Sequence, residues 1–125
     1  MAWGTLRNGI VGISGTDYQP PIPNKEDILL GIDQITDGSN SITERAIRIM
    51  LYLMRAQVFW DGNKRTSMIV ANKIMIENGK GIITIKEEFI NEFNKLLSEY
   101  YTTGGNNSIV RFIYDNCIFG LEIKE

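Results

Sequence analysis

The sequence of 125 residues contains no histidine and only one cysteine, Cys117. Without an imidazole, the chain lacks the side chain that most readily exchanges protons near neutral pH and that most often ligates metals. A single cysteine cannot form an internal disulfide, so we predict a protein of a reducing, cytoplasmic compartment. Cys117 lies in the apolar stretch FIYDNCIFG, which favours a buried structural thiol over a nucleophile.

Long apolar runs and a strong charge of one sign are absent as well. No apolar stretch approaches the roughly 18 residues that a membrane span needs, and the N-terminus has no basic-then-apolar signal segment. The formal net charge is −2, so no general basic field favours nucleic acid or an anionic membrane, and any anion site must be local. We therefore expect neither nucleic acid nor a membrane as a partner.

Length and composition predict a single domain over residues 1–125. Its N-terminal part, residues 1–23, is rich in glycine, proline and short polar residues. Within it, the apolar stretch from Ile10 to Ser14 indicates a short strand, and the Ser-Gly-Thr-Asp that follows indicates a turn. We therefore predict a small β-hairpin flap, ahead of a helical core over residues 24–125.

Apolar periodicity and capping residues predict five helices in this core, the second of them central and largely buried. The predicted fold class is mainly α, a helical bundle with a small β-hairpin flap. The expected signals are, in order, an Asn24 cap, a Ser41–Glu44 capping box, a third helix from about Lys64 to Asn78 with a stop at Gly79, a Thr84–Glu87 capping box for a fourth helix through Tyr101, and a fifth helix over about 108–119.

Five consecutive polar or charged residues, Asp61-Gly62-Asn63-Lys64-Arg65, separate the second helix from the third. Glycine and asparagine readily adopt positive φ, so the chain can turn sharply here and direct successive N–H groups into one concavity. The next helix adds unsatisfied donors, and Lys64 and Arg65 add positive charge, which together form a phosphate-sized anion site. Asp61 supplies a carboxylate that can hold Mg²⁺ beside phosphates. The alternative is an ordinary turn with solvated cations, although two cations at a helix N-terminus oppose the helix dipole.

These residues resemble the Fic/Doc family. Its signature, His-x-Phe-x-Asp/Glu-Gly-Asn-Gly/Lys-Arg, aligns with the stretch from Gln57 to Arg65, and six of its seven defined positions match. The stretches GISGTDYQPP and ITERAIRIMLYLMRAQ also resemble the family's flap and the helix that leads into the motif. The resemblance covers nearly the whole chain and implies the family's helical fold.

The resemblance implies a protein adenylyltransferase, which moves AMP from ATP to a hydroxyl of a target protein. By position, Asp61 would hold Mg²⁺, and Arg65 would pair with a terminal phosphate. The anion hole would be built by Gly62, Asn63 and Lys64. The flap would bind an extended segment of the target protein by strand addition. The flap residues implied in this docking are Ile10, Val11, Gly12, Ile13 and Ser14.

Gln57 stands where the family has the histidine that takes a proton from the target hydroxyl. Glutamine forms hydrogen bonds but cannot exchange a proton near neutral pH. Removal of a general base typically lowers a rate by about 10²- to 10⁴-fold, so we expect impaired transfer, while phosphate and metal binding depend on other residues. Glu44 and Asp33 become replacement bases only if the fold brings them to Gln57.

Two alternative functions stay open. The first is a non-catalytic nucleotide- or phosphate-binding pseudoenzyme, because Gln57 is not a base. The second is a Doc-like protein kinase toxin, because Lys64 replaces the glycine of AMP-transferring members and is typical of the Doc branch. The family's inhibitory helix finds no match here. The resemblance then implies that this helix comes from a separate antitoxin-like inhibitor chain or from a region outside this sequence, or that regulation is absent because activity is. Family members also often form homodimers, although no apolar stripe in this sequence requires one.

Overall fold

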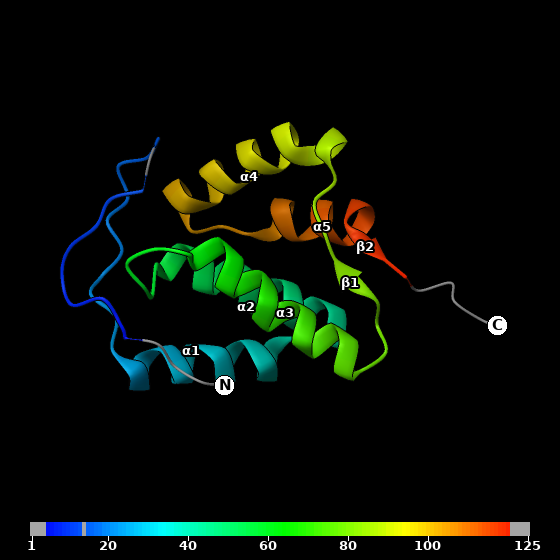
Figure 1. The fold of residues 1–125 in the computed structure, drawn as a ribbon, viewed down its shortest axis with the longest axis horizontal. Helices are drawn as coiled ribbons and strands as arrows, with labels where there is room; N and C mark the ends of the chain where they lie inside the picture. Colours follow the sequence, from blue (N-terminus) through cyan, green and yellow to red (C-terminus); the bar gives the residue numbers. More distant parts are fainter. Residues whose placement is uncertain (1–4, 14, 121–125) are drawn as a thin grey trace.

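The computed structural model describes residues 5–13 and 15–120, and most of them form helices (Figure 1). The mainly α class is therefore confirmed, together with one small antiparallel sheet. The elements are α1 (Lys25–Gly38), α2 (Ile42–Ala56), α3 (Asn63–Glu77), β1 (Ile82–Ile83), the 3₁₀ turn η1 (Glu87–Phe89), α4 (Ile90–Thr103), α5 (Asn107–Asn116) and β2 (Ile118–Phe119).

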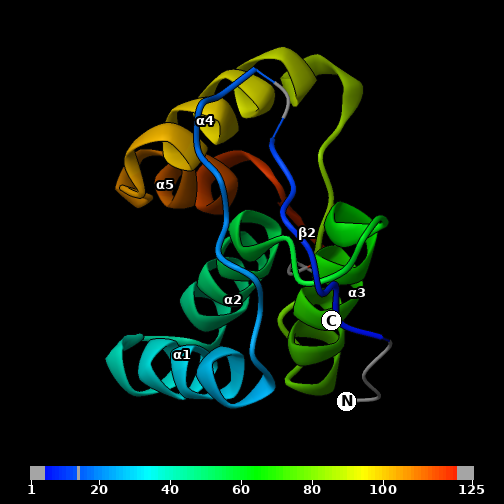
Figure 2. The same cartoon turned by 90° about the vertical axis from the view of Figure 1, so that its left-hand side faces the viewer.

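Helix α2 lies at the centre of the structure, with α1 on one side, α4 and α5 on the other, and α3 packed along its length (Figures 1 and 2). The prediction of a central, largely buried second helix is confirmed. Its buried side chains bind the other helices together through apolar contact, which is the main favourable term in folding. They are Ala46, Ile47, Ile49, Met50, Leu51, Leu53 and Met54.

The first two helix starts agree with the sequence. The side-chain oxygen of Asn24 accepts hydrogen bonds from the N–H groups of Glu26 and Asp27, at 2.8 and 3.2 Å. The hydroxyl of Ser41 accepts from the N–H of Glu44 at 3.1 Å. The Glu44 carboxylate accepts a hydrogen bond from the N–H of Asn40 at 3.0 Å. In a standard capping box it would accept from the N–H of the cap residue itself, Ser41.

The predicted start of the fourth helix and the predicted end of the fifth are wrong. Helix α4 begins at Ile90, after η1, and α5 ends at Asn116. The cause is the pairing of β1 with β2, in which Ile82 faces Phe119 and Ile83 faces Ile118. Thr84 continues this pairing, because its N–H donates to the carbonyl of Cys117 at 3.0 Å. This N–H is therefore not available to Glu87 for a capping box, and the first helical turn begins only at Glu87.

The N-terminal segment forms a wide loop that rises toward α4 and returns to the start of α1 (Figure 2). The strand predicted at Ile10 is not formed in the described part of this segment, and Ser14 lies outside the described residues. Among the described residues the segment has no partner strand, and an isolated two-stranded hairpin is marginal in water. The prolines at its end, Pro20 and Pro21, also lack the N–H that a ladder requires. We call residues 9–21 the flap below.

No helix among the described residues is both long enough and apolar enough to cross a membrane.

Cys117 is expected to resist thiol reagents until the protein unfolds. Its side chain is fully buried, and burial raises the pKa of the thiol to about 11. At pH 8 only about one thiol in a thousand would then be the reactive thiolate. Labelling with a chromogenic disulfide at pH 8 should be slow in buffer and complete within minutes in concentrated urea. Rapid stoichiometric labelling of the folded protein would contradict the buried position.

Candidate functional site

The corner between α2 and α3 is built by two residues in the left-handed region. Gln57 follows the last residue of α2 and has φ 47°, and Gly62 precedes α3 and has φ 70°. Gln57 is the only non-glycine residue with positive φ in the described part of the chain. A non-glycine residue rarely adopts this backbone conformation, which is strained, so surrounding contacts must hold Gln57 in it.

The side chain of Asn63 holds the corner together from inside. It is 7% exposed, its oxygen accepts from the N–H of Phe59 at 2.9 Å, and its amide nitrogen donates to the Phe59 carbonyl at 2.8 Å. The same nitrogen lies 3.3 Å from the side-chain oxygen of Gln57. The hydroxyl of Ser67 donates to the Asn63 carbonyl at 2.6 Å. With its side chain engaged in this way, Asn63 can offer a ligand only its backbone N–H.

The start of α3 leaves several donors without an acceptor in the helix. The first backbone bond of the helix runs from the N–H of Thr66 to the carbonyl of Gly62, at 2.9 Å. The N–H groups of residues 63–65 therefore precede the hydrogen-bonded part of the helix. A Cβ on Gly62 would lie 2.9 Å from the guanidinium of Arg65, which shows how closely that side chain approaches the backbone of the corner.

These residues line one cleft of about 530 Å³ that also includes part of the flap. The charged residues Asp61, Lys64 and Arg65 are all exposed, and none of them takes part in an ion pair within the described residues. The remaining lining residues are Gly12, Ile13, Gln57, Trp60, Gly62, Asn63 and Tyr101. The structure thus brings the predicted motif residues together with two of the predicted flap residues.

Other predicted flap residues do not line this cleft. Ile10 is 70% exposed, Val11 is half-buried outside the cleft, and Ser14 lies outside the described residues. Conversely, Tyr101 belongs to the cleft although its sequence context predicts only a core position. Tyr101 has both positions, because its side chain is 5% exposed and still lines the cleft.

A family model for the Fic/DOC family matches residues 4–75. This range is more than half of the chain and contains the flap, α1, α2 and the whole motif. The chain belongs to the Fic/DOC family. Among the curated proteins, the search finds no match.

The Fic motif of this chain has an amide where the family has its base. The Gln57 side chain donates to the Met54 carbonyl at 2.6 Å and accepts from Asn63. Its two polar atoms therefore both bond within the corner. Gln57 therefore makes structural contacts at the position of the family histidine, but it has no group that could accept a proton from a hydroxyl.

Neither suggested replacement base lies at this Fic motif. Glu44 is in the first turn of α2, about 20 Å along that helix from Gln57 at a rise of 1.5 Å per residue. It is paired with Arg48 at 2.7 Å, and this hydrogen bond lowers the pKa of its carboxyl. Asp33 lies on α1 and is not part of the cleft. Asp61 is the only carboxylate that lines the cleft in the described part of the chain.

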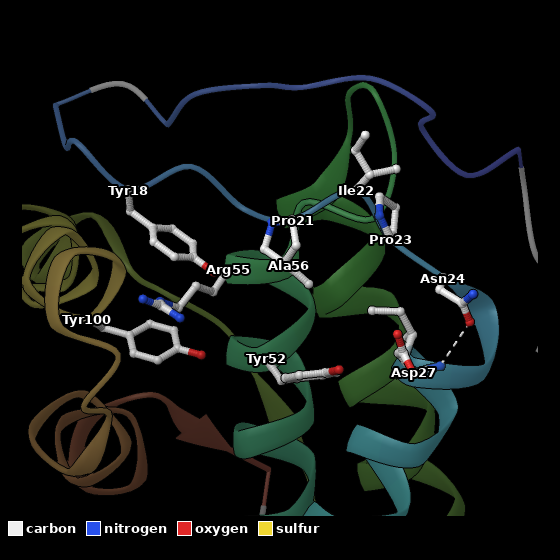
Figure 3. A pocket seen from close by; sticks show the side chains of 11 residues that line it. Tyr18, Pro21, Ile22, Pro23, Asn24, Asp27, Tyr52, Arg55, Ala56 and Tyr100 are labelled. Carbon is white, nitrogen blue, oxygen red and sulfur yellow. Dashed lines mark hydrogen bonds between the residues drawn. The ribbon is translucent and has the colours of Figure 1, made fainter.

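A second pocket lies beside the Fic motif and shares no residue with it (Figure 3). It encloses about 200 Å³ between the returning limb of the flap, α1, α2 and α4, with Tyr52 and Asp27 among its lining residues. Arg55 lies between the rings of Tyr18 and Tyr100 in Figure 3, and its guanidinium carbon is 3.7 Å from the centre of the Tyr18 ring. This cation–π contact holds the end of the flap against α2.

The buried residue that sequence reasoning missed is Arg7. Its guanidinium is enclosed where the flap meets the end of α2, and its side chain is essentially inaccessible to solvent. Its only sequence signal was a positive charge before a predicted strand, which is typical of any solvated arginine. Its partners lie as many as 50 positions away in the chain, so no local pattern could have revealed the contact.

Proposed function

We propose that this Fic domain binds ATP with Mg²⁺ in the motif cleft and is by descent a protein adenylyltransferase, slowed by Gln57. The observation that carries the proposal is that the first residues of α3, two exposed cations and, among the described residues, a single carboxylate all line one cleft. N–H groups and cations at a helix start bind phosphates. The flap residues in the same cleft would bring the target hydroxyl to the nucleotide.

The residues of the cleft fit Mg²⁺ held jointly with phosphates. Asp61 is exposed and can offer one carboxylate ligand. The described residues contain no group of three or more acidic, histidine or cysteine side chains that could hold a metal by themselves. This suits Mg²⁺, which commonly takes one or two carboxylates and completes its shell with phosphate oxygens and water. When bound, the ion would neutralise charge on the phosphates.

The roles of the protein groups follow from their positions. The N–H groups of residues 63–65 would donate to phosphate oxygens, and Arg65 would pair with a terminal phosphate as a charge-assisted donor. Gln57 lines the same cleft, but its amide is bonded to the Met54 carbonyl and to Asn63, so the proton of a target hydroxyl would have no base to accept it. Binding would therefore survive, while transfer would be slow.

The backbone of the flap supports docking of a target segment as an added strand. In the described residues, the only backbone hydrogen bond within the flap runs from the N–H of Thr16 to the carbonyl of Ile13. The other backbone groups from Ile10 to Ile13 are thus available to an extended segment. An antitoxin-like inhibitor chain and a homodimer remain predictions from the family resemblance.

ATP labelled at different phosphates separates the candidate functions. After incubation with cell lysate, α-label on protein supports AMP transfer, and γ-label supports phosphate transfer by a Doc-like kinase. The second outcome is considered because the exposed Lys64 side chain lines the cleft and adds charge where AMP-transferring members have glycine. Absence of both labels, with ATP binding measured by calorimetry, supports a non-catalytic binder. Absence of ATP binding would refute the proposal.

Asp61→Asn is expected to weaken ATP binding in the presence of Mg²⁺ by about tenfold, or about 1.4 kcal/mol. The reason is that the amide keeps the shape of the side chain but loses the charged ligand. The ATP affinities that calorimetry measures with Mg²⁺ and with a chelator should therefore be similar for this variant. Asp33→Asn, which alters an exposed carboxylate on α1, is the matched control. An unchanged Mg²⁺ dependence in Asp61→Asn would contradict the assignment.

A further inference from the structure

Arg7 is a buried charge whose partners are all backbone carbonyls. It is 1% exposed, and it forms no ion pair with a carboxylate in the described residues. Its guanidinium donates to five carbonyls, those of Gly9 at 2.7 Å, Pro20 at 3.3 Å, Pro21 at 2.7 Å, Ala56 at 3.1 Å and Gln57. Since a buried cation is costly unless its donors are satisfied, this set of acceptors is what permits the burial.

The five acceptors come from three places that are far apart in the chain. Gly9 begins the flap, Pro20 and Pro21 end it, and Ala56 and Gln57 end α2. One guanidinium therefore closes the base of the flap and joins it to the first residue of the Fic motif. At the same time it satisfies carbonyls at the end of α2 that have no helical donor, and a cation is favourable at this end of a helix.

Within the described residues, the flap has no other hydrogen bonds to the rest of the protein. Among the described residues, every hydrogen bond that links residues 9–21 to a residue outside that range comes from Arg7. The backbone N–H of Arg7 is itself bonded to the Val58 carbonyl at 3.1 Å, within the motif. Two contacts of another kind also hold the flap. Tyr18 stacks on Arg55 on the returning limb, and the side chain of Ile13 packs against the main hydrophobic core. Arg7 thus supplies the hydrogen bonds that tie both ends of the flap to the rest of the described structure.

We propose that Arg7 is the positioning residue of the flap, fixing both ends of the flap and the backbone of Gln57 to one rigid, planar group. The role of the flap in target docking rests on the proposed function, but the anchoring itself does not. Lysine cannot replace arginine here, because a single ammonium has three donors and lacks the planar fork that reaches carbonyls from three segments. Loss of Arg7 should therefore loosen the flap specifically and leave the anion site at α3 in place.

Amide hydrogen exchange measured by mass spectrometry tests this in Arg7→Met and Arg7→Lys. Met keeps the length and apolar stem without donors, and Lys keeps the charge. The flap amides that can report loosening are those of Thr16 and Tyr18, which are hydrogen-bonded in the described structure. In the flap peptides these two amides should exchange about tenfold faster or more in Arg7→Met than in the wild-type protein, and less so in Arg7→Lys. Peptides from α3 and α5 should change by less than about twofold. Arg111→Met removes an arginine whose side chain is 81% exposed, and should leave flap exchange unchanged.

The comparison between flap and core peptides decides the outcome. If the flap exchanges at the wild-type rate in Arg7→Met, or if flap and α3 peptides accelerate equally in both variants, Arg7 has no positioning role and the proposal is overturned. Calorimetry with ATP is run on the same proteins, and the affinities of Arg7→Lys and the wild type should agree within about threefold. If none of them binds ATP, the proposed function fails, while the exchange result still decides the role of Arg7.

Discussion

Replacing Gln57 with histidine is expected to raise the rate of AMP transfer from ATP to protein by about 10²- to 10⁴-fold. Position 57 already lies in the cleft with Asp61 and the start of α3, so an imidazole there would face the same site. Its unperturbed pKa is near 6.5, which makes it a competent base at neutral pH. Glutamine at this position binds the Met54 carbonyl and Asn63 and offers no such group.

The measurement is transfer of α-labelled nucleotide to protein in lysate, for the wild type, Gln57→His and Gln57→Asn. Asparagine is the matched control, because it changes the side chain without introducing a base. Since the base acts in its neutral form, the rate of Gln57→His should rise with pH through about 6.5 and then level off. If Gln57→His is no faster than Gln57→Asn with any target, the missing base is not what limits this protein.

Asn63→Ala is expected to destabilise the fold by about 2–4 kcal/mol and to weaken ATP binding strongly. The variant removes three hydrogen bonds of a side chain that is 7% exposed, and it leaves the N–H and carbonyl of Phe59 without these partners. The corner would then lose the side-chain contacts that tie Phe59 and Gln57 to the start of α3. The N–H groups of α3 would no longer be fixed around one point, so phosphate binding should fall as well.

Urea unfolding gives the change in stability, and calorimetry gives the change in ATP affinity. Asn94→Ala is the matched control, because Asn94 is an exposed residue of α4, and its replacement should change stability by no more than about 0.5 kcal/mol. A loss of stability in Asn63→Ala similar to that of the control would show that the side chain does not hold the corner. If Asn63→Ala is destabilised but keeps its ATP affinity, the side chain of Asn63 stabilises the fold without being needed for phosphate binding.

The helices and the motif could be predicted because their signals are local. A cap such as Asn24 depends on residues two and three positions away, and the prediction that Gly79 stops the third helix agrees with an α3 that ends at Glu77. The motif residues from Asp61 to Arg65 are consecutive, so any turn there places them in one region. The Fic/DOC family match then follows from the same stretch and its neighbours.

The errors arose where distant residues compete for the same backbone groups. Thr84 has the sequence of a helix cap, but the carbonyl of Cys117 takes its N–H, and the pairing of β1 with β2 delays α4 and shortens α5. Asn72 also holds the backbone of β1, because its side chain accepts from the N–H of Ile83 at 2.6 Å and donates to the carbonyl of Ile83 at 3.0 Å. The predicted hairpin failed for the opposite reason, because its segment has no partner strand in the described chain.

By itself, the sequence determined the helical class, the family and the charged corner, since periodicity, caps and a contiguous motif act over a few residues. Only the tertiary structure decided which side chains of that corner face the cleft and which hold it from within, as Asn63 does. It alone also decided that Arg7 joins the flap to Gln57 across 50 positions in the chain. The physical reason is that a buried polar group must find its hydrogen-bond partners wherever folding places them, and those places are set by the packing of the whole chain.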